Sequence, residues 1–142
     1  MFSRLSNAAL VVWCAVLMPA CASPPDLEIT DARVRTPVPG RDTTAGYFVL
    51  RNNTAATVTL QGARSPHARS IEIHRTYVKD DRVRMQRVRA SDIEPGQQLE
   101  FAPGGLHLMI FGVTDMPEPF PITLLFTDGR QLSVPFSKLS YQ

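Results

Sequence analysis

Two histidines and two methionines in the middle of the chain are the residues best suited to chemistry. They are His74, Met85, His107 and Met109, separated by ten, twenty-one and one intervening residues. Together they offer imidazoles and thioethers, with neither a thiolate nor a carboxylate. Cu(I) bonds well to neutral sulfur, whereas Zn(II) sites use Cys, His and carboxylates and seldom a thioether. The set therefore predicts a Cu(I) site.

These four residues use most of the imidazoles and thioethers outside the N-terminal segment. The chain has three His and five Met, and two of the Met precede residue 23. The leftover residues are His67, beside a proline in an expected turn, and Met116, before a proline in an expected loop. We expect a ligand role for neither.

The elements that must position the site are strands. In a strand, residues i and i+2 share a face, so His107 and Met109 would point outward together while Leu108 and Ile110 face the core. The preceding segment 103–105, Pro-Gly-Gly, is a turn signal that would start this strand near the edge of a sheet, where an ion can reach it.

The other two candidates lie in two further alternating runs. Ile71 and Ile73 take one face of the first run, so His74 is expected on the opposite, outward face. Met85 shares a face with Val83. Its position is therefore open between a ligand role and packing in the core or at a sheet edge.

The whole domain consists of short strand-like runs separated by turn residues, with hardly any helical periodicity. Asp128-Gly129 between two such runs is the clearest hairpin signal. This spacing predicts an antiparallel β-sandwich. The expected strands are 27–35, 45–52, 56–61, 69–78, 82–89, 97–101, 106–113, 121–127 and 130–136.

Length and charge limit the function classes. The 142 residues fit one domain with a proper core, and a formal charge of +2 gives no electrostatic case for nucleic acid. We find no nucleophile-elbow motif, and a copper monooxygenase with a histidine brace would need His at its mature N-terminus. We therefore expect a carrier and no enzyme.

Residues 1–22 are typical of an export signal, which leaves 23–142 as the copper-binding domain. Arg4 supplies the basic start, an apolar run of eleven residues is too short to span a bilayer, and small residues end the segment. Cleavage before Ser23 would release a soluble periplasmic protein. Cleavage before Cys21, at an imperfect lipobox, would leave a lipidated and membrane-anchored cysteine, and both outcomes stay open.

The two cysteines, Cys14 and Cys21, both lie in or next to this segment, so the folded domain has no thiol. This excludes a blue-copper electron carrier, whose site needs a Cys thiolate. Thioethers also suit an oxidising compartment, because methionine forms no disulfides there.

A basic stretch overlaps the expected site. Seven arginines fall within the 26 residues 64–89. One interpretation is solvated strand faces, paired in part with acidic neighbours. The other is a cationic rim that steers an acidic partner and weakens with salt. The arginines are Arg64, Arg69, Arg75, Arg82, Arg84, Arg87 and Arg89.

The spacing H-x10-M-x21-H-x-M and the segment PGGLHLM at 103–109 resemble the periplasmic copper chaperones of the PCu(A)C family. The likeness extends over roughly residues 27–136, through LEITDARVRTPVPG at 27–40, AGYFVLRNN at 45–53 and SPHARSIEIH at 65–74. The sequence departs from the family pattern after His74, where Arg75 and Thr76 supply neither an acid nor an extra thioether.

The resemblance implies a cupredoxin-like Greek-key β-sandwich that binds one Cu(I) per chain through His74, Met85, His107 and Met109. It also implies a periplasmic monomer that delivers copper to the Cu(A) site of a cytochrome c oxidase subunit, together with a SCO-type protein. Two alternatives stay open. One is a periplasmic copper buffer or resistance protein without a dedicated acceptor, and the other is an Ig-like interaction module that binds no metal.

Overall fold

The computed structural model describes residues 25–139, so the expected export signal at 1–22 lies outside the described residues. Within this range the chain forms ten strands and no helix. The strands are β1 (Leu27–Arg35), β2 (Thr44–Asn52), β3 (Val58–Arg64), β4 (Ala68–Lys79), β5 (Arg82–Val88), β6 (Ser91–Ile93), β7 (Gln98–Phe101), β8 (Leu106–Val113), β9 (Phe120–Phe126) and β10 (Gln131–Leu139).

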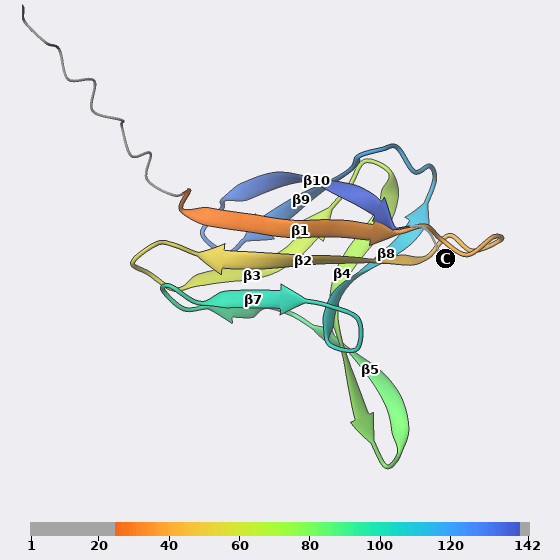
Figure 1. The fold of residues 1–142 in the computed structure, drawn as a ribbon, viewed down its shortest axis with the longest axis horizontal. Coiled ribbons are helices and arrows are strands. Elements are labelled where there is room, and N and C mark those ends of the chain that lie inside the picture. The colour runs from red at the N-terminus through yellow and green to blue at the C-terminus, as the bar shows by residue number, and fades with distance from the viewer. Residues whose placement is uncertain (1–24, 140–142) are drawn as a thin grey trace, which may run out of the picture.

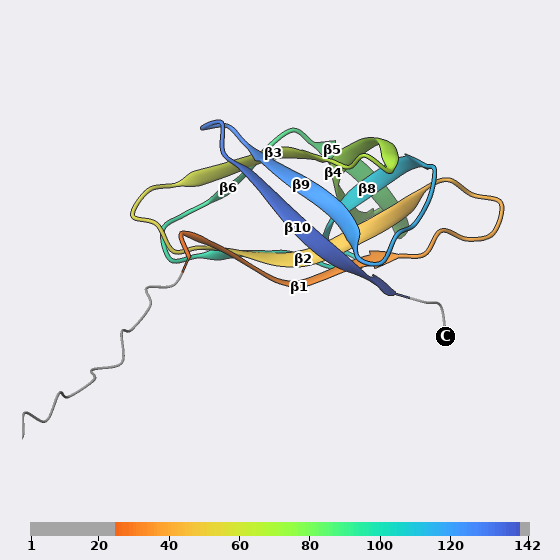
Figure 2. The ribbon, with the colours of Figure 1, turned by 90° about the horizontal axis from the view of Figure 1, so that it is seen from above.

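The all-β prediction is confirmed for the described residues, and the sheet that forms is barrel-like. The strands make one sheet in the order β5-β4-β8-β7-β2-β1-β10-β9-β3-β6, and further pairing of β3 with β4 closes it into a barrel-like shape (Figures 1 and 2). Closure pairs strands that two separate sheets would leave as edges. The expected antiparallel pattern is also only partly right, because β1–β10 and β7–β8 are parallel.

The core follows the alternation of the strand sequences. On β9, Phe120, Ile122, Leu124 and Phe126 are all buried, and the residues between them are more exposed. The Asp128-Gly129 hairpin is confirmed, with Gly129 in the left-handed conformation (φ 87°) that the turn requires. The sequence missed only the short strand β6, which pairs with β3.

One hairpin differs from the rest. Figure 1 shows the end of β4 and the whole of β5 extending away from the barrel. Strand β5 pairs with β4 alone, and six of its seven residues are exposed. In the described part of the chain, no helix is long and apolar enough to span a bilayer.

Candidate metal site

The four predicted ligands lie on three adjacent strands. In the register between β4 and β8, His74 is directly opposite His107, and Glu72 is opposite Met109. In the register between β4 and β5, Thr76 is opposite Met85. Because paired residues share a face, as do residues two apart, all four candidates lie on the face opposite the core residues Ile73 and Leu108.

The side chains converge at one place on this outer face. The ring centroids of His74 and His107 are 6.0 Å apart. Met85, His107 and Met109 line a hollow of about 310 Å³, and His74 lies beside it, next to His107. The fold therefore brings together two imidazoles and two thioethers from a span of 36 residues, His74 to Met109.

His107 is less accessible than the sequence indicated. We expected it to face outward and lie exposed, but only 5% of its surface is accessible. The alternation is right and the exposure is wrong: the ring bonds to the Gly105 carbonyl in the turn before β8, and Pro103 and Gly104 of that turn line the same hollow. Gly105 anchors this turn, since its carbonyl accepts a hydrogen bond from the Thr76 amide at 3.0 Å, and its amide donates to Ala102 at 3.0 Å.

Met85 is the most accessible of the four candidates, with 52% of its surface exposed. The interpretation of Met85 as a core residue is therefore wrong. The alternation of Val83 and Met85 resembles that of a buried strand face, but β5 extends away from the barrel and six of its seven residues are exposed. The Met85 side chain lines the hollow and is half exposed.

Hydrogen bonds assign the proton on the His107 ring. Its Nδ1 lies 3.1 Å from the Gly105 carbonyl oxygen, which can only accept, so Nδ1 carries the proton and Nε2 keeps a free lone pair. Burial lowers the pKa of His107, the Gly105 hydrogen bond partly opposes this, and the nearby His74 lowers it further. The ring is therefore neutral at physiological pH, as a metal ligand must be.

The His74 ring makes its hydrogen bond through the other nitrogen, Nε2. Its Nε2 lies 2.9 Å from a carboxylate oxygen of Glu72 and donates to it, which leaves the lone pair on Nδ1. This Nδ1 is buried and makes no hydrogen bond among the described residues. Buried polar atoms are nearly always paired, so an unpaired ring nitrogen next to a second imidazole fits a ligand for a soft cation.

From the sequence, Glu72 was expected on the face of His74 and as a partner of the arginines, but no role at the site was assigned to it. One of its oxygens holds His74, and the other lies 3.3 Å from the Arg87 guanidinium on β5. A carboxylate that orients a ligand histidine is a common second layer of metal sites. The signal was present in the sequence, because Glu72 and His74 are two apart in a strand and must share a face.

The leftover histidine and methionine lie outside this cluster. His67 Nδ1 bonds to Asp115 at 2.6 Å, and Met116 packs partly buried against the core. Of the seven arginines, Arg87 pairs with Glu72, and Arg64 bonds to Gln131. The expected pairing with acidic neighbours is therefore found for Arg87, whereas the partner of Arg64 is neutral.

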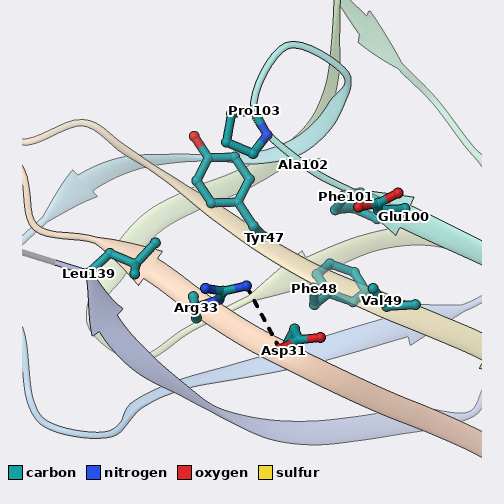
Figure 3. A pocket seen from close by; sticks show the side chains of 10 residues that line it. All are labelled: Asp31, Arg33, Tyr47, Phe48, Val49, Glu100, Phe101, Ala102, Pro103 and Leu139. Atoms are coloured by element: carbon teal, nitrogen blue, oxygen red, sulfur yellow. Dashed lines mark ion pairs between the residues drawn. The ribbon is translucent and has the colours of Figure 1, made fainter.

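A second hollow, of about 260 Å³, lies on the neighbouring strands β1, β2 and β7 (Figure 3). Asp31 and Arg33 at its rim form an ion pair of 3.8 Å. Its lining contains no His or Met, while Tyr47 and Pro103 line both hollows. These two residues form the wall between the second hollow and the candidate metal site.

Comparisons with known proteins place the chain in a family. The family profile described as "Putative lipoprotein LpqE-like" matches residues 27–137. The chain belongs to the LpqE-like family. It is also 31% identical over 123 residues to "Putative lipoprotein Lxx21020" of Leifsonia xyli subsp. xyli, a match that covers 82% of this chain and 74% of the relative.

Solved structures show which fold this LpqE-like chain shares. It is similar to the copper-bound PCuAC domain from PmoF2, with a TM-score of 0.69 at 20% identity, covering 84% of this chain and 97% of that domain. It is also similar to apo-DR1885 from Deinococcus radiodurans, with a TM-score of 0.56 at 22% identity, covering 99% and 96% of the two chains. At these identities the likeness establishes the PCuAC fold.

Proposed function

We propose that this LpqE-like protein is an exported Cu(I)-binding metallochaperone with one site per chain. The observation that carries the proposal is the convergence of His74, Met85, His107 and Met109 on one outer face, with a free lone pair on each imidazole. The similarity to a domain whose structure contains copper supports it. Neutral nitrogen and sulfur donors favour Cu(I) over harder ions.

The accessibility of the donors suits a carrier better than a storage site. The half-exposed Met85 can be replaced by a ligand of an acceptor while the buried His107 still holds the ion. Copper would then pass between proteins by ligand exchange without becoming free. Because the core lies on the other face of the strands, the apo protein should stay folded.

Titration with Cu(I) against a competing chelator tests the site. We expect one Cu(I) per chain, and Met109→Leu and His107→Asn should each lower the affinity at least tenfold, because each removes a donor with little change in volume. The matched controls Met116→Leu and His67→Asn remove the same groups outside the site and should leave the affinity unchanged. Wild-type protein that takes up no copper would instead favour the interaction module.

We propose the Cu(A)-containing subunit of cytochrome c oxidase as the acceptor, with a SCO-type protein acting alongside. The support is the exposed hairpin next to the hollow. The face of the hairpin that carries Met85 also carries Val78 and Val83. These two residues are opposite each other in the register and are 70% and 73% exposed. The other face of the hairpin carries the exposed cations Lys79, Arg82 and Arg84. An acidic, partly apolar partner fits these two faces.

Transfer of Cu(I) to an apo Cu(A) domain, followed at increasing salt, tests the acceptor. Arg82→Glu with Arg84→Glu should slow transfer about tenfold or more without changing the Cu(I) affinity, and salt should slow the wild type. Arg51→Glu with Lys138→Glu makes the same charge change away from the hairpin and should have little effect. A deletion strain that keeps oxidase activity at low copper but tolerates high copper poorly would indicate a buffer or resistance protein.

We propose that the protein is exported to the periplasm and that a lipid on Cys21 anchors it to the membrane. The names of the family and of the Leifsonia relative, both described as lipoproteins, support the lipid. Mass spectrometry of the mature N-terminus tests this directly. A chain that begins at an unmodified Ser23 would show a soluble protein instead.

A further inference from the structure

Glu72 lies on the site face of β4, and both of its carboxylate oxygens are engaged. Oε2 accepts from His74 Nε2 at 2.9 Å, and Oε1 lies 3.3 Å from a guanidinium nitrogen of Arg87. The Glu72 side chain is 26% exposed and that of His74 15%, whereas the Arg87 side chain is 66% exposed, so solvent screens the contact with Arg87 more than the contact with His74.

The bond to His74 decides which ring nitrogen is left without a partner. With Nε2 held by Glu72, the imidazole can present only Nδ1, which is the buried atom that lacks a partner among the described residues. Without the carboxylate the ring could turn over, and its lone pair would lose its fixed direction. Orienting carboxylates of this kind are typically worth 10- to 100-fold in metal affinity.

The bond to Arg87 connects the same carboxylate to the strand that carries Met85. Arg87 is opposite His74 in the register, and it is two residues from Met85, so the two side chains share a face. Among the ion pairs of residues 25–139, this is the one that joins β5 to another strand. The Glu72 side chain therefore contacts both a candidate imidazole ligand and a residue of the strand that carries a candidate thioether ligand.

We propose that Glu72 is the positioning residue of the site, which fixes the His74 ring with Nδ1 as its free nitrogen and, through Arg87, holds β5 and Met85 beside it. The effect on copper rests on the proposed function. The effect on the imidazole does not, because it is a property of the apo protein.

The experiment compares Glu72→Leu, which removes the acceptor, with Glu72→Gln, whose amide oxygen can still accept from Nε2. In apo wild-type protein, proton and nitrogen NMR should show a slowly exchanging His74 Nε2–H. We expect this signal to persist in Glu72→Gln and to vanish in Glu72→Leu. Circular dichroism checks the fold, and Glu100→Leu on β7 is the matched control with no expected change.

Cu(I) affinity, measured against a chelator, is the second readout. Glu72→Leu should bind 10- to 100-fold more weakly than wild type, with Glu72→Gln closer to wild type. Arg87→Gln should keep the Nε2–H signal and lose affinity severalfold. Unchanged affinity in Glu72→Leu, or a wild-type His74 that is not protected at Nε2, overturns the proposal. If the wild type binds no Cu(I), the proposed function fails, while the NMR signal still decides the role of Glu72.

Discussion

The two long hairpins of this protein have the same topology but opposite surroundings. The β9–β10 hairpin packs Phe120, Ile122, Leu124 and Phe126 into the barrel. The β4–β5 hairpin leaves the barrel after its first half, and its distal pair Val78 and Val83 are among the most exposed apolar residues. The first hairpin stabilises the fold along its whole length, whereas the second contributes to the core only through the first half of β4 and carries the candidate ligand Met85 on its exposed strand. Stability and ligand presentation are thus separated within one sheet.

The largest effect should come from the packed hairpin. Phe126→Ala removes a ring that is 1% exposed and should cost about 3–5 kcal/mol of unfolding free energy. Val83→Ala on the projecting hairpin should change it by less than about 0.5 kcal/mol. Urea denaturation followed by circular dichroism measures both. Equal costs would mean that the β4–β5 hairpin packs against the barrel in solution.

The next effect concerns Cu(I) affinity. Here a substitution in the β4–β5 hairpin should have a larger effect than one in the β9–β10 hairpin. Met85→Leu should lower Cu(I) affinity about 10-fold or more while leaving the urea midpoint unchanged, because the side chain is half exposed and only its sulfur matters. Its counterpart Leu124→Met places a thioether in the core and should leave copper binding as it is. A Met85→Leu protein with wild-type affinity would reduce the site to three donors.

A smaller effect is expected in the pH dependence of the apo protein. Burial lowers the pKa of His107, so between its ordinary value near 6.5 and the lower folded value the unfolded state binds more protons than the native state. The stability due to the neutral ring is therefore complete above the ordinary value, and it is lost as the pH falls toward the folded pKa. NMR titration of the His107 ring should give a midpoint below 6.5, and a midpoint at or above this value would contradict the burial.

The smallest effect should come from the turns. The β4–β5 turn places Asp80 and Asp81 in the left-handed region, with φ 51° and 54°, whereas Gly129 occupies this region in the β9–β10 turn. Asp81→Gly should relieve the backbone and stabilise the hairpin by less than about 1 kcal/mol. Hydrogen exchange of the β5 amides should slow down. Faster exchange would show that the Asp-Asp turn is already the better sequence for this hairpin.

Much of the fold could be predicted because its strands alternate strongly. The runs at 27–35 and 106–113 agree with β1 and β8 at both ends, and most of the other expected strands differ by only a few residues. The short β6 was missed because three residues carry no readable period. Closure of the sheet was also missed, since the pairing of β3 with β4 and the parallel pairing of β1 with β10 depend on how the whole sheet bends.

The site could be predicted as a set of donors but not as a geometry. That Met85 would be exposed could not be seen, because an alternating strand looks the same whether or not another layer covers it. That His107 would be buried could not be seen either, because its surroundings depend on how the turn before β8 bonds to Thr76 of β4 and to the ring itself. These outcomes depend on contacts between distant segments.

The sequence by itself determined which ligand groups are available, namely imidazoles and thioethers without a thiolate. It also determined that they lie on strand faces away from apolar neighbours. Side-chain type and the two-residue period of a strand are local properties, so one chain segment is enough to read them. Only the tertiary structure decided that His74 is opposite His107, that Glu72 holds one ring, and that β5 projects. Strand register follows from packing over the whole barrel, and no local segment contains it.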